Sequence, residues 1–128
     1  MTPTHLSFQR HNRLLTSADF QRVFAGSRRS RDALFMVCAR YHNKPDTRLG
    51  LAISKRHARH AVQRNRIKRI AREYFRQHRD TLATADYVVV NHAAATNATN
   101  AALAESLQTH FRRLSSQRAD RRQPSSKQ

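Results

Sequence analysis

The stretch AVQRNRIKRIAREYFRQHR, residues 61–79, decides the fold of this chain. At about 100° per residue, its apolar side chains fall on one side of a helix, within about 80° of Ile67. This apolar stripe comprises Ile67, Ile70, Ala71, Tyr74 and Phe75. Such spacing predicts an amphipathic helix that docks on a hydrophobic core.

The opposite arc of this helix is almost entirely cationic. It comprises Asn65, Arg66, Lys68, Arg69, Arg72 and Arg76, with Arg64 at its border. Only Glu73 interrupts the arc. A solvated face is the ordinary alternative, but such a face usually mixes both signs of charge to gain pairs four residues apart. The excess of one sign favours a surface that follows phosphates, and the amide of Asn65 suits a base edge or a 2′-hydroxyl.

The charge of the whole chain indicates the same kind of partner. Its 128 residues include 25 Lys and Arg against 8 Asp and Glu, which gives a net charge of +17. A polyanion relieves this self-repulsion through release of its condensed counterions. Nucleic acid is therefore the expected partner, and an anionic membrane surface is the competing interpretation.

A short helix is expected ahead of this region. Residues 1–15 precede it as an extended basic lead-in. Thr16 and Asp19 have the spacing of a capping box, and Gly26 is suited to end the helix. The apolar face of this helix comprises Phe20, Val23 and Phe24.

Three strands and a last helix complete the expected order. Residues 34–39 and 49–54 are apolar runs separated by a turn at residues 42–46, so a hairpin is predicted. Residues 86–90 form a third strand, and a last helix covers residues 100–114. The order αββαβα predicts an α+β fold, a two-layer α/β sandwich with the helices on one face of a small, mostly antiparallel sheet.

The length fits one domain, over residues 1–114. Residues 115–128 are rich in Ser, Gln and Arg, which predicts a basic disordered tail. No apolar run approaches the roughly 18 residues of a membrane span, so no membrane partner is expected. The single cysteine, Cys38, cannot form an internal disulfide, and the reducing cytoplasm is the expected location.

Residues for catalysis by the protein itself are hard to find. Its eight histidines are scattered and have no evident carboxylate partner in the sequence. His57 and His60 could lie one turn apart and bind a metal, but no Cys or acidic ligand lies nearby. The eight acidic residues are dispersed, and the chain has only two glycines for a phosphate loop. We expect no catalytic residue and no metal site in the protein.

The basic region also has a specific family signature. Residues 54–73, centred on Arg64-Asn65-Arg66, resemble the signature of the bacterial ribonuclease P proteins. Flanking motifs occur in the right order, so the resemblance covers roughly residues 10–114. These motifs are Asp19-Phe20 with Val23-Phe24, Arg48-Leu49-Gly50-Leu51, and Asp86-Tyr87-Val88-Val89-Val90.

The resemblance implies a function as a cofactor. The chain would be the protein subunit of a ribonucleoprotein endoribonuclease that removes the 5′ leader of precursor tRNA. Its partners would be the catalytic RNA subunit, which carries out hydrolysis with RNA-bound Mg²⁺, and the single-stranded leader. The resemblance also implies a left-handed βαβ crossover, although handedness rules favour the opposite hand.

The resemblance assigns candidate binding residues. Family members contact the catalytic RNA at the positions of Arg64, Asn65, Arg66, Lys68 and Arg69. Four more residues extend this surface, namely Lys55, Arg56, Arg59 and Arg72.

A second implied site is a groove for the leader, between the sheet and the first helix. Its expected residues are Phe20, Phe24 and Phe35, although spacing alone predicts Phe20 and Phe24 as core. Family members often have another aromatic residue that faces this groove from the strand over residues 34–39. We align its position with Cys38.

Three other functions fit parts of the sequence. A structural RNA-binding protein, such as a ribosomal protein, would use the same basic helix and tail. A self-sufficient nuclease would use the histidines. A DNA-recognition helix is also conceivable, but the spacing lacks a helix-turn-helix and a dimer seam.

Overall fold

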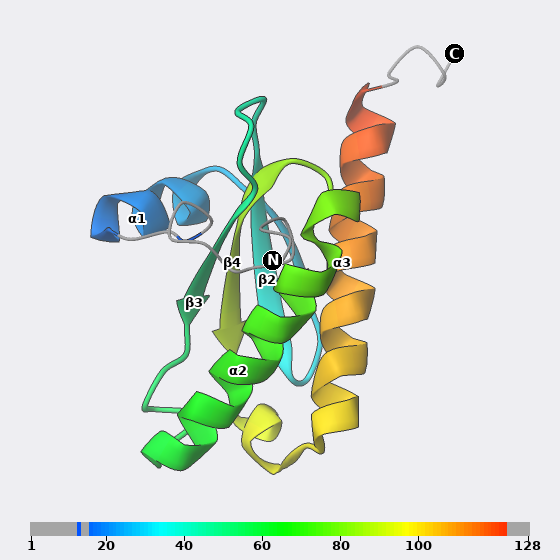
Figure 1. Ribbon diagram of the computed structural model, residues 1–128. Coiled ribbons are helices and arrows are strands. Elements are labelled where there is room, and N and C mark those ends of the chain that lie inside the picture. The colour runs from blue at the N-terminus through cyan, green and yellow to red at the C-terminus, as the bar shows by residue number, and fades with distance from the viewer. Residues whose placement is uncertain (1–12, 14–15, 123–128) are drawn as a thin grey trace, which may run out of the picture.

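The computed structural model describes residue 13 and residues 16–122 of the chain (Figure 1). Its long elements are α1 (Ser17–Ala25), β1 (Arg28–Arg31), β2 (Phe35–Tyr41), β3 (Arg48–Ala52), α2 (Ala61–His78), β4 (Ala85–Asn91) and α3 (Asn100–Arg122). Two short 3₁₀ turns, η3 (Arg79–Thr81) and η4 (Ala93–Asn97), flank β4. The α+β class is confirmed, and the order gains one strand. Most of the predicted lead-in lies outside the described residues.

The strands form a four-stranded sheet of order β1-β2-β4-β3. β2 is antiparallel to both β1 and β4, whereas β3 is parallel to β4. The predicted hairpin between residues 34–39 and 49–54 is therefore wrong, because β4 lies between these strands. Six of the seven β4 residues are buried, and a strand covered on both faces belongs in the middle of a sheet.

β1 is the strand missing from the predicted order. Its sequence, RRSR, has no apolar residue, and only Ser30 is buried. It is an edge strand, held by backbone pairing from Arg28 opposite Ala39 to Arg31 opposite Met36. Hydrophobic alternation cannot reveal such a strand, and charged side chains are common on sheet edges.

The chain passes from β3 through α2 to the parallel strand β4. In Figure 1 both strands run downward, β4 lies to the right of β3, and α2 crosses in front of the sheet. This path is a left-handed crossover, which is rare among βαβ units. The crossover implied by the resemblance is confirmed.

Helices cover both faces of the sheet. The larger core lies under α2 and α3, where Val37, Tyr87 and Val89 meet Ile67 and Leu107. α1 lies on the opposite face. There Val23 packs on Cys38 and Val88 in a smaller cluster. The expectation that all helices share one face does not hold for α1, because alternate residues of β2 and β4 are apolar on both faces.

The predicted caps of α1 are confirmed. The Asp19 N–H donates to Thr16 Oγ1 (3.1 Å), and the Thr16 N–H donates to Asp19 Oδ2 (3.3 Å), which completes a capping box. Gly26 follows the last turn as the C-cap. α1 therefore begins and ends where its sequence predicts.

α3 continues to Arg122 rather than ending at Leu114. Contacts made by polar side chains hold the added turns. Ser115 Oγ accepts from the Ala83 N–H (3.0 Å), and Arg118 Nη1 donates to the carbonyls of His42 (3.1 Å) and Thr84 (2.9 Å). These partners lie far away in the sequence, so composition alone suggested a disordered segment from residue 115.

Candidate nucleic-acid interface

α2 presents its charged arc outward because its apolar stripe is anchored. Ile67, Ala71 and Phe75 are buried in the core shared with α3. Ile70 and Tyr74 pack at the margin of this core. The amphipathic reading of residues 61–79 is therefore confirmed, and the opposite arc faces away from the core.

The cations on this arc differ in their exposure and in whether they form an ion pair. Arg69 and Asn65 are exposed, while Lys68 and Arg72 are half-buried. Within the described part of the chain, no carboxylate pairs with Lys68, Arg69 or Arg72. Arg76, in contrast, pairs with Glu73 (2.6 Å). Three neighbouring positive charges are thus left without a counter-charge of their own.

The segment between β3 and α2 extends this surface. Lys55, Arg56 and Arg59 are all exposed there. A hydrogen bond to the end of β4 anchors the start of this segment, because the Ser54 N–H donates to Asn91 Oδ1 (2.8 Å). α2 then begins without an acidic residue in its first turn, so the partial positive charge of the helix N-terminus adds to these side chains.

Two arginines of the Arg64-Asn65-Arg66 motif serve the fold. Arg64 Nη1 donates to the carbonyls of Ala58 (3.0 Å) and Arg59 (2.8 Å), and so fastens the segment before the helix. Arg66 donates to Asn100 Oδ1 (2.8 Å) and to the Thr96 carbonyl (3.0 Å). Spacing placed Arg66 on the outward arc and Arg64 at its border. These distant acceptors could not be found from the local sequence.

Two of the three residues predicted to bind the leader lie on the α1 face of the sheet. Phe20 and Phe24 are half-buried and pack beside Met36, Ala52 and Val90 on the α1 face. Each ring is therefore partly covered by the sheet and partly exposed, and its role in leader binding stays a prediction. They lie along one side of α1, above the sheet.

The prediction that Phe35 lines the leader groove is wrong. Its side chain is 0% exposed and belongs to the core beneath α2 and α3. Side chains alternate along β2, so Phe35, Val37 and Ala39 point away from α1. Cys38 points toward α1, and Val23 covers it. Burial raises the pKa of the Cys38 thiol, so this position offers neither an aromatic ring nor a reactive thiolate.

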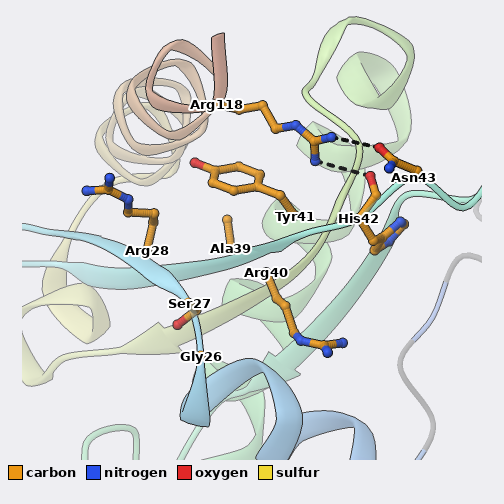
Figure 2. A pocket seen from close by; sticks show the side chains of 9 residues that line it. All are labelled: Gly26, Ser27, Arg28, Ala39, Arg40, Tyr41, His42, Asn43 and Arg118. Atoms are coloured by element: carbon orange, nitrogen blue, oxygen red, sulfur yellow. Dashed lines mark hydrogen bonds between the residues drawn. The ribbon is translucent and has the colours of Figure 1, made fainter. Parts of the chain in front are cut away.

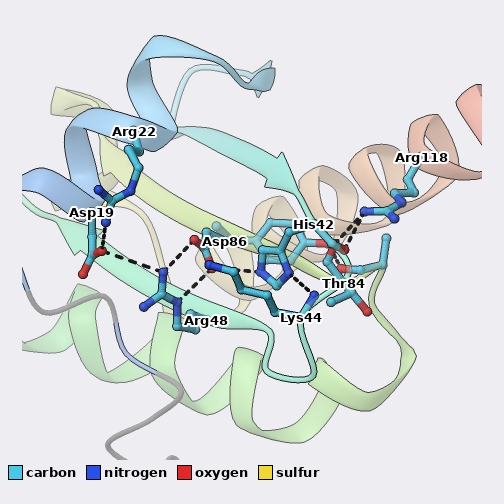
Figure 3. A network of polar contacts seen from close by, with 10 residues as sticks. Asp19, Arg22, His42, Lys44, Arg48, Thr84, Asp86 and Arg118 are labelled. Carbon is cyan, nitrogen blue, oxygen red and sulfur yellow. Dashed lines mark hydrogen bonds and ion pairs between the residues drawn. The ribbon is translucent and has the colours of Figure 1, made fainter.

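A buried charge network fixes α1 over the sheet (Figure 3). Arg48 donates to Asp86 Oδ1 (3.0 Å) and Oδ2 (2.8 Å), and its Nη2 lies 3.8 Å from Asp19 Oδ1 on α1. His42 Nε2 lies 3.1 Å from Asp86 Oδ1. Burial alone would raise the pKa of Asp86, but the hydrogen bonds and charge of Arg48 outweigh it and lower that pKa.

A second histidine also has a carboxylate partner. His110 Nδ1 shares a hydrogen bond with Ser30 Oγ (2.6 Å), and its Nε2 lies 3.2 Å from Asp32 Oδ1. The sequence showed no evident carboxylate partner for any histidine, and the fold supplies one for His42 and for His110, since the sheet and α3 bring distant segments together.

The group of Ser30, His110 and Asp32 resembles a catalytic triad only in composition. His110 is 0% exposed and Ser30 is 4% exposed, so no substrate can reach the hydroxyl. Arg113 Nη1 also donates to Ser30 Oγ (2.7 Å). This group ties β1 and the turn after it to α3. Burial raises the pKa of Asp32, but hydrogen bonds from Phe35, Ser106 and Leu34 lower it to about 2.

The described residues contain no group of three or more His, Cys, Asp or Glu side chains that could hold a metal ion. His60 is exposed and His57 half-buried, and no third ligand of these types joins them in the part of the chain that is described. None of the helices described here is both long and apolar enough to cross a membrane.

These features define a class of protein: small, strongly basic and α+β, with a left-handed crossover that carries a cationic helix. The family model for ribonuclease P matches residues 8–115. The chain belongs to the ribonuclease P protein family. It is thus a protein subunit of the endoribonuclease that processes the 5′ ends of precursor tRNA.

Individual relatives support this assignment. The chain is 45% identical over 108 residues to the ribonuclease P protein component of Thioalkalivibrio sulfidiphilus, covering 84% of this chain and 90% of that one. The Methylococcus capsulatus component is 42% identical over 104 residues, or 81% of each chain. The solved RNase P protein of Staphylococcus aureus superposes with a TM-score of 0.73 at 30% identity, over 79% of this chain and 93% of that one. The Thermotoga maritima protein shares the fold, with a TM-score of 0.70 at 24% identity, over 79% of this chain and 96% of that one.

Proposed function

We propose that this protein docks on the catalytic RNA through the outward face of α2 and the segment before it. The observation that carries this proposal is the group of Lys68, Arg69 and Arg72, which lacks carboxylate partners among the described residues on a helix rigidly anchored by its other face. The contact surface also includes Lys55, Arg56, Arg59 and Asn65. A fixed cationic ridge binds a phosphate backbone without first breaking internal ion pairs.

Arg64 and Arg66 have a double role in this proposal. Each guanidinium carries several N–H donors, and the acceptors inside the protein use only some of them. The internal bonds fix the planes of both side chains, so little conformational entropy is lost when a phosphate binds the remaining donors. Exposed Asn65, between them, is free to contact a base edge or a 2′-hydroxyl.

The single-stranded 5′ leader of the precursor binds beside α1, on the rings of Phe20 and Phe24. Each ring is held by the Val23, Cys38 and Val88 cluster and keeps part of its surface open. Stacking on aromatic rings tolerates any base, which suits a subunit that must accept many leader sequences. Phe35 has no part in this groove because it is buried on the other face.

In this proposal the RNA and its bound Mg²⁺ carry out hydrolysis, and the protein contributes fixed positive charge. That charge replaces part of the counterion atmosphere around the RNA and its substrate, so less Mg²⁺ is needed. The assembly is placed in the bacterial cytoplasm, which suits a chain with one free, buried cysteine.

The experiment that tests the proposal is cleavage of a 5′-extended precursor tRNA at low Mg²⁺ concentration. A bacterial ribonuclease P RNA is assayed with and without the protein, and the protein is assayed alone. We expect cleavage only when both are present. Cleavage by the protein alone would make it a nuclease in its own right, and tight RNA binding without stimulation would favour a structural RNA-binding protein.

A further inference from the structure

A hollow of about 790 Å³ lies where β2 continues beyond the paired length of β1 (Figure 2). It is lined by Gly26, Ser27, Arg28, Ala39, Arg40, Tyr41, His42, Asn43 and Arg118. The pairing of β1 begins with Arg28 opposite Ala39, so the last residues of β2 form an open edge. α3 lies over one side of this edge, and the end of α1 lies on the other (Figure 2).

The hollow is cationic and has no acidic residue in its lining. Arg28 comes from the start of β1, Arg40 from β2 and Arg118 from the added turns of α3. None of the three pairs with a carboxylate within the described part of the chain. Asp86 lies opposite Arg40 in the sheet register, but Arg48 and His42 already engage its carboxylate.

Arg118 is held in place without being neutralised. Its guanidinium donates to the carbonyls of His42 and Thr84 and to Asn43 Oδ1 (3.0 Å), which are all neutral acceptors. It lies over the Tyr41 ring, 5.3 Å from the ring centroid. The Tyr41 hydroxyl in turn donates to the Leu114 carbonyl (2.6 Å). The wall of the hollow is therefore preorganised and carries positive charge without a counter-charge.

We propose that this hollow is a further RNA-binding site, which takes phosphate groups of a single-stranded RNA segment that crosses the edge of β2. Arginine suits this ligand because its planar donors match phosphate oxygens in pairs. Arg28 and Arg118 line the α3 side of the edge and Arg40 the other side (Figure 2), so one backbone segment can contact both sides in turn.

This site is separate from the α2 surface. Tyr41 pairs with Ala85 at the start of β4, whereas β3 runs parallel to β4 and ends beside Val90, before the Lys55–Arg59 segment. The hollow and that segment are therefore at opposite ends of the sheet. The inference rests on the proposed function, because it takes RNA as the ligand. The segment bound here comes either from the catalytic RNA or from the leader of the precursor.

The test compares the full-length variants Arg28→Gln and Arg40→Gln with Arg31→Gln. Arg31 is exposed on the same strand as Arg28 but lies outside the hollow, so the control removes the same charge. Binding to ribonuclease P RNA is measured over a series of salt concentrations. Binding of the holoenzyme to precursor tRNA is measured with and without a leader.

We expect each hollow variant to weaken one of these complexes roughly tenfold and to reduce its log–log salt slope by about 1, while Arg31→Gln changes both far less. Weaker binding of ribonuclease P RNA identifies the catalytic RNA as the source of the segment. Weaker binding only of the leader-bearing precursor identifies the leader. Equal effects of all three variants would overturn the inference.

Arg69→Gln, measured in parallel, separates this inference from the proposed function. If Arg69→Gln weakens RNA binding and the hollow variants match Arg31→Gln, only the proposed site in the hollow fails. If Arg69→Gln is also without effect, the proposed α2 interface fails with it. Thermal unfolding of each variant checks that lost binding does not come from lost folding.

Discussion

The Arg66 guanidinium donates a 2.8 Å hydrogen bond to Asn100 Oδ1, and so joins the cationic face of α2 to the first residue of α3. The same side chain reaches the Thr96 carbonyl in η4. A residue expected to serve RNA binding therefore also holds together the elements that present the proposed RNA-binding surface. Loss of RNA binding on its substitution would have two sources.

Arg66→Ala should reduce both stability and RNA binding. Removal of the side chain leaves the Thr96 carbonyl and Asn100 without their donor, which costs about 1–3 kcal/mol. Arg69→Ala, on the exposed part of the same helix, should weaken RNA binding with a change in stability below about 0.5 kcal/mol. Urea unfolding and RNA titration of both variants separate the two roles. Unchanged stability of Arg66→Ala, or unchanged holoenzyme assembly, would contradict this account.

Phe20→Ala should weaken binding of precursor tRNA and leave binding of mature tRNA unchanged. One stacked base contributes about 1–3 kcal/mol, so the expected loss is roughly fivefold to 100-fold. The measurement is holoenzyme affinity for the two tRNAs. Val23→Ala, a core change beneath the same helix, is the control for destabilised α1. Equal losses for both tRNAs would show that Phe20 acts through packing alone.

Asp86→Asn should destabilise the protein by about 3 kcal/mol at neutral pH, because the partly buried charge of Arg48 loses its hydrogen-bonded carboxylate and keeps only the longer ion pair with Asp19 (3.8 Å). The pKa of Asp86 is lowered in the folded state, so the ionised carboxylate stabilises the fold above its unfolded pKa of about 4. This stabilisation is lost as the pH falls through the folded pKa. Urea unfolding should therefore show that the difference in the free energy of unfolding between wild type and variant shrinks as the pH falls below about 4. A difference that is independent of pH would contradict the ion pair.

Truncation after Leu114 should destabilise the domain, whereas truncation after Arg122 should not. The shorter chain loses Ser115, whose Oγ accepts from the Ala83 N–H, and Arg118, which donates to two carbonyls. Loss of these partners costs about 2 kcal/mol or more, which corresponds to a fall in Tm of roughly 8 °C or more. Thermal unfolding of both truncated chains provides the test. Equal Tm values would restore the expectation of a disordered segment from residue 115.

Local patterns in the sequence determined much of this protein. The apolar stripe on residues 61–79 set α2 and its outward charge, and the Thr16–Asp19 capping box and Gly26 set the ends of α1. These features depend on contacts within one or two helical turns, so periodicity and capping rules suffice to find them. The motif around Asn65 was specific enough to indicate the family.

Tertiary structure alone decided which elements meet. It placed β4 between β2 and β3, turned Phe35 into the core, and gave His42 and His110 their carboxylate partners. Each of these outcomes depends on contacts between residues distant in the chain. A strand's pattern shows that alternate residues are buried, but not against which helix.

Dependence on contacts between distant residues also explains why the sequence did not show the structural role of three arginines. The sequence predicted Arg64 and Arg66 as RNA contacts and placed Arg118 in a disordered tail. In the structure each of them donates to backbone carbonyls of another segment. A guanidinium at the end of a long side chain can reach acceptors in any element that folds nearby. Charge composition therefore indicated a polyanion as the partner, and only the fold decided which cations are committed to internal hydrogen bonds and which remain available to a partner.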